Sequence, residues 1–182
     1  NYALTIDGKR GDTTVEGGAK LMGTGTVGKL TVNDPGTVAP GHSPGCMNTS
    51  DLTIAGTYEA QLGGTTACDG YDQLKVVGTV TLSGTLNLQM VNDFKPKNGT
   101  KFTIIDNDGS DAVSGNFAGL VEVATVTSGQ YSFKISYKGG DGNDVVLSVI
   151  GVPNTGVEIL TAHPLWTLIT TTLLAAGIAL SA

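Results

Sequence analysis

Leu30-Thr31-Val32 returns as Leu52-Thr53-Ile54 and again as Leu74-Lys75-Val76, and this recurrence of an apolar-polar-apolar triplet decides the fold. The triplets begin at positions 30, 52 and 74, so the step along the chain is the same both times. Two further tracks keep this step, namely Val38, Ala60, Leu82 and Ile104, and Gly36, Tyr58, Val80 and Phe102. A fixed step predicts a solenoid, because each coil stacks on the last and buries the same face. The expected fold class is all-β, a right-handed parallel β-helix of about 22 residues per coil with three short strands in each.

The two cysteines keep the same step as the triplets. Cys46 and Cys68 are as far apart in the sequence as Leu30 and Leu52, so the predicted register places them on adjacent coils. Paired strands lie about 4.8 Å apart, within the roughly 4.4–6.8 Å range of Cα separations that a disulfide accepts. The spacing therefore predicts a Cys46–Cys68 disulfide, with two unpaired loop thiols as the alternative. A metal site would need more ligands than this segment offers, since His42 alone is near.

The period blurs beyond Ile105 and a different pattern replaces it. Residues 131–137 alternate between apolar and polar, and residues 145–150 form a second strand-like run. The Gly- and Asp-rich stretch between them, 138–144, is typical of a turn. We expect an antiparallel hairpin over 131–149 that caps the open end of the solenoid, because an uncapped coil is an exposed strand edge.

Two acidic stretches are candidates for calcium. The stretch from Gly139 to Leu147 fits the calcium-binding nonapeptide pattern once, with Asp141 and Asp144 as the ligand candidates. Such sites are built from stacked copies, so a plain hairpin turn is the favoured interpretation. Residues 106–111 lack the spacing of an EF-hand and are interpreted as a solvated loop. We expect no metal and no cofactor.

Catalysis requires a convergent set of groups, and the sequence before residue 151 supplies few candidates. It holds a single histidine, His42, and no serine in a Gly-x-Ser-x-Gly elbow. Parallel β-helices can act on polysaccharides with carboxylates, which leaves Asp69, Asp72 and Asp93 as candidates. We expect no enzymatic activity. The alternative is a carbohydrate-active enzyme, a lyase or glycosidase, whose active site lies in coils upstream of this chain.

The C-terminal part of the chain differs in character from the rest. Residues 159–182 contain no Asp, Glu, Lys or Arg, and the stretch 165–182 is just long enough for a membrane-spanning helix. We therefore expect an ectodomain over 1–150, a linker over 151–158 and a transmembrane anchor over 159–182. The chain begins without Met or a secretory signal, so we interpret it as the C-terminal fragment of an exported protein.

The linker contains Val152-Pro153-Asn154-Thr155-Gly156. This stretch resembles the Leu-Pro-x-Thr-Gly sorting signal of sortase substrates, which bacteria attach to the cell wall. Pro153, Thr155 and Gly156 match that pattern, whereas Val152 replaces Leu and no basic residue follows the apolar span. The resemblance implies that a sortase cysteine attacks the Thr155 carbonyl and transfers the protein to a wall amine.

The corner Ala39-Pro40-Gly41-His42-Ser43-Pro44-Gly45 resembles the A-P-G-x-S-P-G corner of bacterial surface β-helix proteins of the autotransporter-passenger type. The similarity covers about residues 23–150 and continues through Tyr71-Asp72-Gln73-Leu74, Gly78-Thr79-Val80, Gly84-Thr85-Leu86, Gly99-Thr100-Lys101-Phe102, Gly115-Asn116-Phe117 and Gly142-Asn143-Asp144-Val145. It implies an elongated surface stalk or adhesin and leaves the ligand open.

The formal net charge of −6 argues against nucleic acid as a partner. Together these patterns predict a bacterial cell-surface structural or adhesin module. Its expected partners are a sortase, the cell wall, the membrane through the C-terminal helix, and a glycan or protein ligand.

Overall fold

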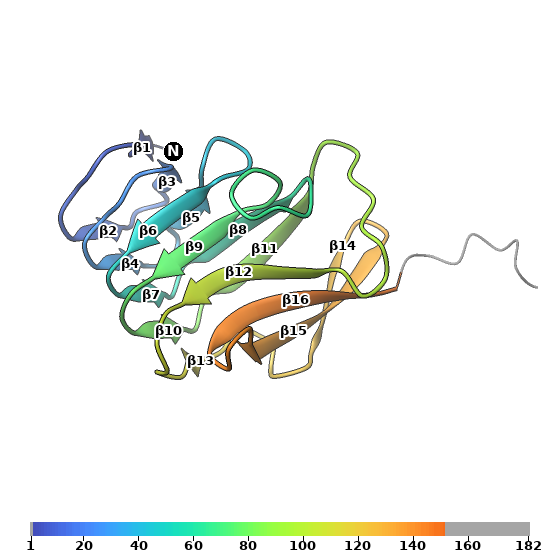
Figure 1. Cartoon of the computed structure of the whole chain (residues 1–182). Helices are drawn as coiled ribbons and strands as arrows, with labels where there is room; N and C mark the ends of the chain where they lie inside the picture. The colour runs from blue at the N-terminus through green and yellow to red at the C-terminus, as the bar shows by residue number, and fades with distance from the viewer. Residues whose placement is uncertain (1, 152–182) are drawn as a thin grey trace, which may run out of the picture. The chain divides into compact units, whose positions relative to one another are not determined.

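The computed structural model describes residues 2–151, which form an all-β fold of three sheets (Figure 1). Sheet A contains, in spatial order, β1 (Ala3–Thr5), β3 (Lys20–Gly23), β5 (Thr37–Pro40), β8 (Thr57–Leu62) and β11 (Thr85–Met90). Sheet C contains β2 (Thr13–Val15), β4 (Leu30–Val32), β7 (Leu52–Ile54), β10 (Val80–Leu82) and β13 (Ser114–Gly115). Sheet B contains β6 (Cys46–Thr49), β9 (Gln73–Val76), β12 (Lys101–Asn107), β16 (Asp144–Gly151), β15 (Tyr131–Gly139) and β14 (Thr125–Ser128).

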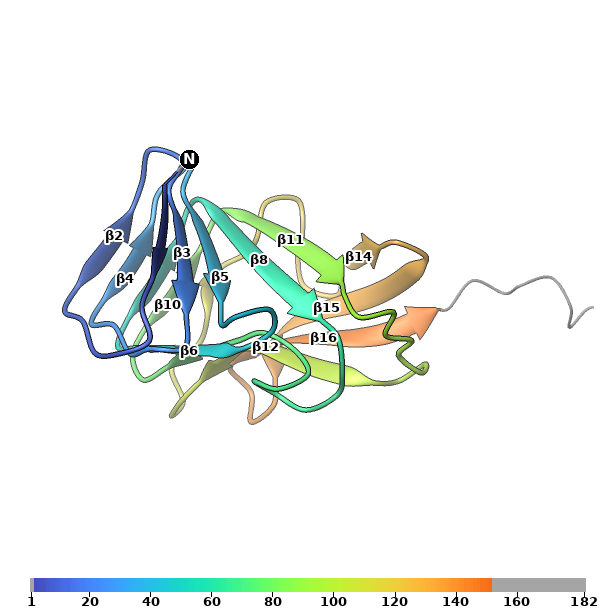
Figure 2. The same cartoon turned by 90° about the horizontal axis from the view of Figure 1, so that it is seen from above.

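The chain winds through the three sheets in turn. After β5 in sheet A it enters β6 in sheet B and then β7 in sheet C, and the next coil repeats this order with β8, β9 and β10. Neighbouring strands therefore come from successive coils and pair in parallel, as Figures 1 and 2 show from two sides. In the first two coils, sheet B is represented by the isolated bridges of Lys9 with Thr26 and of Thr26 with Asn48.

The observed register differs from the predicted constant step. Leu30 pairs with Leu52, but Leu52 pairs with Val80, whereas Leu74 lies in sheet B beside Met47 and Ile105. In sheet A the coil step from Ala3 to Lys20 equals the step from Lys20 to Thr37. The step then lengthens from Thr37 to Thr57 and again from Thr57 to Thr85. The second predicted column is also wrong, because Val38 pairs with Tyr58 and Ala60 with Leu88.

Loops of unequal length explain the changing step. The connection from sheet A to sheet B is 41–45 in one coil, 63–72 in the next and 91–100 in the one after. The connection from sheet C to sheet A stays short, with residues 55–56 and 83–84 in the later coils. A loop that projects at a corner leaves the pairing of the strands intact, yet it shifts every following residue in the sequence.

The predicted fold class is therefore wrong as stated. The coils do not share the single length that the sequence pattern predicted, and the structure is an all-β fold with three mostly parallel sheets. Residues 2–151 contain no helix, and so none that is long and apolar enough to cross a membrane. The transmembrane helix predicted at 159–182 lies outside the described residues.

Parallel stacking arranges the core in columns of similar residues. Side chains alternate along a strand, so residues one above another in successive coils point the same way. One inward column of sheet A consists of Leu4, Leu21, Val38, Tyr58 and Leu86, and one of sheet C consists of Val15, Val32, Ile54 and Leu82. Between the inward columns of sheet C, Thr14, Thr31, Thr53, Thr81 and Ser114 form an outward polar column.

The hairpin expected over 131–149 is formed by β15 and β16, which pair in antiparallel fashion. β16 also pairs with β12, so the hairpin extends sheet B at the end of the molecule opposite β1 (Figure 1). The Tyr137 hydroxyl accepts the N–H of Phe117 (3.0 Å) and donates to the carbonyl of Leu120 (2.6 Å). The Ser128 hydroxyl donates to the carbonyl of Leu88 on β11 (2.8 Å). These contacts close the C-terminal end of the core.

Main chains approach each other closely at the corner between sheets C and A. Gly36, Gly56 and Gly84 occupy this corner in successive coils. The N–H of Thr57 donates to the carbonyl of Gly36 (2.9 Å), and the N–H of Thr85 donates to that of Gly56 (2.8 Å). A Cβ at position 56 would overlap the Gly36 carbonyl oxygen, and one at position 84 would overlap that of Gly56. Backbone atoms held in a ladder cannot move aside, so these three positions admit only glycine.

We predict that Gly56→Ala lowers the free energy of unfolding by about 3 kcal/mol, because the added methyl group separates two coils at this corner. Urea unfolding followed by circular dichroism measures the change. Gly11→Ala is the matched control, since a Cβ at position 11 meets nothing within 4 Å. Equal stability of the two variants would contradict the proposed steric role of the glycine corner.

Candidate functional site

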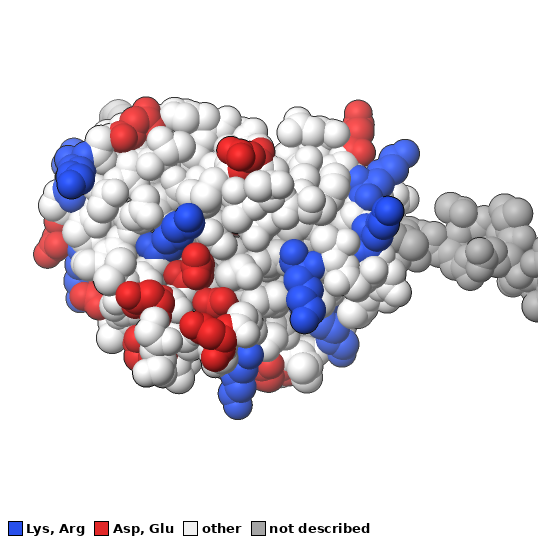
Figure 3. Space-filling model, in the orientation of Figure 1, with Lys and Arg blue, Asp and Glu red and all other residues white. Residues whose placement is uncertain are grey.

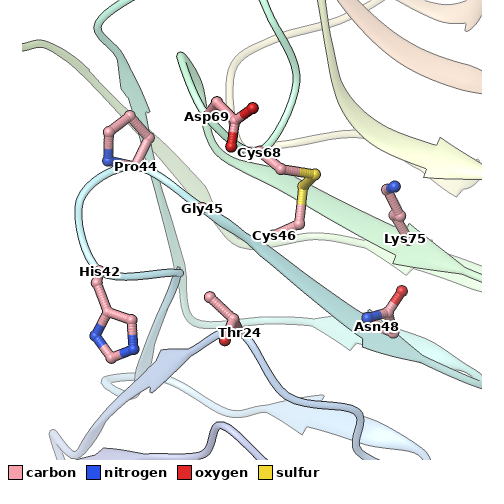
Figure 4. A pocket seen from close by; sticks show the side chains of 9 residues that line it. All are labelled: Thr24, His42, Pro44, Gly45, Cys46, Asn48, Cys68, Asp69 and Lys75. Atoms are coloured by element: carbon pink, nitrogen blue, oxygen red, sulfur yellow. A yellow bond between two sulfur atoms is a disulfide. The ribbon is translucent and has the colours of Figure 1, made fainter.

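A recess of about 450 Å³ lies on the outer face of sheet B, where the loops 41–45 and 63–72 meet (Figure 4). Asn48 on β6 and Lys75 on β9 face outward there, because they alternate with the buried Met47 and Leu74. The lining residues are Thr24, His42, Pro44, Gly45, Cys46, Asn48, Cys68, Asp69 and Lys75. Hydroxyl, amide, carboxylate and ammonium groups thus surround one hollow.

The predicted disulfide is confirmed, and it forms one wall of the recess. Cys46 and Cys68 are bonded, with their Cα atoms 4.7 Å apart. The reasoning from the coil period is wrong, however, because Cys46 pairs in register with Gln73, whereas Cys68 lies in the loop 63–72 with a φ of 70°. The bond therefore fastens a long corner loop to β6.

Asp72, which belongs to the loop 63–72, joins that loop to the loop 41–45 by hydrogen bonds. Its carboxylate accepts the N–H of Gly45 (2.7 Å) through Oδ1 and the N–H of Gln61 (2.9 Å) through Oδ2. Asp72 is only 1% exposed. Burial raises the pKa of Asp72 to about 7, against the lowering effect of the two N–H donors.

His42 is linked to the first coil through Asp7. The Oδ1 atom of Asp7 lies 2.8 Å from His42 Nε2 and accepts the N–H of Thr24 (3.0 Å). The N–H of Thr24 is the main cause that lowers the pKa of Asp7, and His42 adds to it. This exposed group thus positions His42 and Thr24 at the rim of the recess.

The structure does not bring the three candidate catalytic carboxylates together. Asp69 is exposed at the recess, whereas Asp72 is buried with both oxygens bonded to main-chain N–H groups. Asp93 lies in the loop 91–100 and lines a different hollow, beside Phe94 and Tyr131. A pair of carboxylates flanking one substrate bond is therefore not formed by these residues.

The two candidate calcium stretches lie against each other. Asp144 accepts the N–H of Asn107 (2.9 Å), and the amide nitrogen of Asn143 donates to the carbonyls of Asp108 (3.1 Å) and Asp111 (3.3 Å). Burial first, and then the nearby negative charges of Asp106 and Asp141, raise the pKa of Asp144.

Asp141 itself is exposed, and within residues 2–151 no three His, Cys, Asp or Glu side chains form a group that could hold a metal ion. On the face drawn in Figure 3, acidic side chains gather over the region where β12 ends in Figure 1. Asp144 and Asn143 serve as hydrogen-bonding groups that join the hairpin turn to the end of β12.

The sequence interpretation missed Asn48 and Lys75 as recess residues. Strand alternation carried the signal for Lys75, because the triplet Leu74-Lys75-Val76 predicts an outward lysine. No sequence pattern indicated that the loops 41–45 and 63–72 meet. The sorting residues Val152, Pro153, Asn154, Thr155 and Gly156 lie outside the described residues.

No protein-family model matches the sequence, and no curated protein matches it either.

We predict that Asp72 makes the protein less stable as the pH rises from about 4 to about 7. The folded protein binds the Asp72 proton more tightly than the unfolded chain does, so this contribution is present at low pH and is lost as pH passes the folded pKa. Its full size is on the order of 4 kcal/mol. Urea unfolding at a series of pH values should show a slope that Asp72→Asn removes.

Asp69→Asn is the control for this measurement, because Asp69 is an exposed neighbour in the same loop. It should retain the slope of the unchanged protein. An Asp72→Asn protein with an unaltered slope would show that another group dominates the pH dependence.

Proposed function

We propose that this chain is an adhesive or structural module displayed on the bacterial cell surface, and that the recess on sheet B binds a glycan. The observation that carries this proposal is a recess of about 450 Å³ whose lining includes Asn48, Asp69 and Lys75. The resemblance of residues 39–45 to a corner of surface adhesins gives it further support.

The lining of the recess fits the chemistry of a sugar. Each sugar hydroxyl both donates and accepts hydrogen bonds, so a matching site needs both kinds of partner. Asp69 supplies acceptors, Lys75 supplies donors, and the amide of Asn48 supplies both. These groups come from β6, β9 and the loop 63–72, and they border the same hollow (Figure 4).

The fastening of the loops favours binding. The disulfide joins Cys68 to β6, and Asp72 joins the loop 41–45 to β8. A rim that is fixed before the ligand arrives loses less conformational entropy on binding. The recess is thus preorganised by covalent and hydrogen bonds within its own walls.

The proposed attachment uses the motif Val152–Gly156. A sortase thiolate attacks the Thr155 carbonyl, the Thr155–Gly156 bond breaks, and the segment from Gly156 onward leaves with a new amino terminus. An amine of the cell wall then attacks the resulting thioester, forms an amide with Thr155 and releases the thiolate. Pro153 supports this chemistry, because proline disfavours a helical conformation of the residue before it and the proposed attack needs an extended peptide.

We predict that Lys75→Ala and Asp69→Asn each weaken glycan binding at least about tenfold, because each removes a charged group that hydrogen-bonds a hydroxyl. A glycan array identifies the ligand, and isothermal titration calorimetry measures its Kd. Lys97→Ala, in the exposed loop 91–100, is the control and should bind like the unchanged protein. Unaltered binding by both recess variants would remove the recess as the ligand site.

We predict that Thr155→Ala abolishes covalent attachment to the wall, because the sortase pattern requires this residue at the cleaved bond. Cell fractionation after enzymatic digestion of the wall separates linked from unlinked protein. Asn154→Ala changes the variable position of the same motif and should leave attachment intact. A Thr155→Ala protein that distributes like the unchanged one would show that Val152–Gly156 is only a linker.

A further inference from the structure

The two ends of the coil stack are built differently. At the C-terminal end, the hairpin extends sheet B and β14 is tied to β11. At the N-terminal end, within residues 2–151, β1 is the edge of sheet A and β2 is the edge of sheet C. Among the same residues, Lys9 is bridged only to the following coil, at Thr26. Each of the three sheets therefore presents a free edge at this end of the described residues.

The edges of β1 and β2 lack the features that normally prevent pairing, whereas the third edge carries the charged Lys9. Exposed edges are usually protected by charged residues, proline, bulges or a covering segment. β1 reads Ala3-Leu4-Thr5 and β2 reads Thr13-Thr14-Val15, so neither strand contains a charge or a proline. The Tyr2 carbonyl and the Ile6 N–H both bond to β3, and alternation along the strand then leaves the amides of Ala3 and Thr5 on the free side.

The apolar core is also unfinished at this end. Leu4 belongs to the inward column of Leu21 and Val38, yet it is 43% exposed, whereas these two are 1% and 0% exposed. A hollow of about 60 Å³ lies beside it, lined in part by Val15 and Ala19. The column thus ends in a position that one more aliphatic side chain would cover.

We propose that the N-terminal end is the docking surface for one further β-coil, which stacks in parallel on β1 and β2 and belongs to polypeptide preceding Tyr2. The first coils define its length, because Ala3 pairs with Lys20, Lys20 with Thr37 and Thr13 with Leu30, and the step along the chain is the same in all three pairs. The coil carries an apolar residue over Leu4, as the following coil does at Leu21.

The path of the chain indicates this occupant. Tyr2 already lies on the edge, since its carbonyl accepts the N–H of Lys20 (2.9 Å), and the N-terminus is beside β1 in Figure 1. Polypeptide entering at Tyr2 therefore arrives next to the free edges, and stacking continues the interface that joins all following coils. This inference is independent of the proposed function, because it concerns neither the recess nor the sorting motif.

The test adds a coil that already stacks on a neighbouring coil in this structure. A copy of residues 18–36 is fused directly before Ala3, in place of residues 1–2, in the full chain. The copied Lys20 then precedes Ala3 by the same step by which Lys20 precedes Thr37 in the present chain. We expect the Thr5 amide to exchange at least about tenfold more slowly in hydrogen-exchange NMR, and the Tm to rise.

The matched control is the same fusion with Leu21→Asp in the copied segment, which places a carboxylate over the apolar column and should abolish both effects. Unchanged exchange at Thr5 in the first fusion would overturn the proposal. A concentration-dependent dimer of the unfused chain that protects Thr5 would also overturn it, because a second copy would then be the occupant.

Discussion

The structure depends on parallel main-chain pairing between successive coils. This pairing sets a rise of about 4.8 Å per coil and places equivalent positions one above another. Inward positions must then be apolar in every coil, as in the column Leu21, Val38 and Tyr58. It also brings corner backbones together, which is why glycine recurs at positions 36, 56 and 84. Column composition and glycine placement thus have one cause.

Short strands leave main-chain N–H groups at the corners without a ladder partner, and aspartates accept them. Asp7 accepts the N–H of Thr24, Asp12 that of Lys29, and Asp51 that of Thr79. Each of these bonds joins one coil to the next, because the donor lies in the coil that follows. Asp72 also accepts main-chain N–H groups, but it is buried and its donors, Gly45 and Gln61, precede it in the chain. The burial that makes these two bonds effective also raises the pKa of Asp72.

Local patterns in the sequence predicted local structure. The alternation of residues 131–137 led to the hairpin, and the triplets identified strands β4, β7 and β9. Register failed because it depends on loop length: the triplet at Leu74 continues the spacing of Leu30 and Leu52 but belongs to another sheet. Asp72 could be located as a loop residue, yet its partners Gly45 and Gln61 are fixed only when two coils stack.

The same constraint separates the parts of the molecule that can vary from those that cannot. The corner between sheets C and A admits glycine and short connections, whereas the corner between sheets A and B accepts the loops 41–45, 63–72 and 91–100. A loop there changes the coil length without disturbing the ladder. The recess forms between two of these loops, so exposed residues such as Asp69 line it without a role in stacking. The lining of the recess can therefore change at this corner while the columns, glycines and corner aspartates preserve the fold.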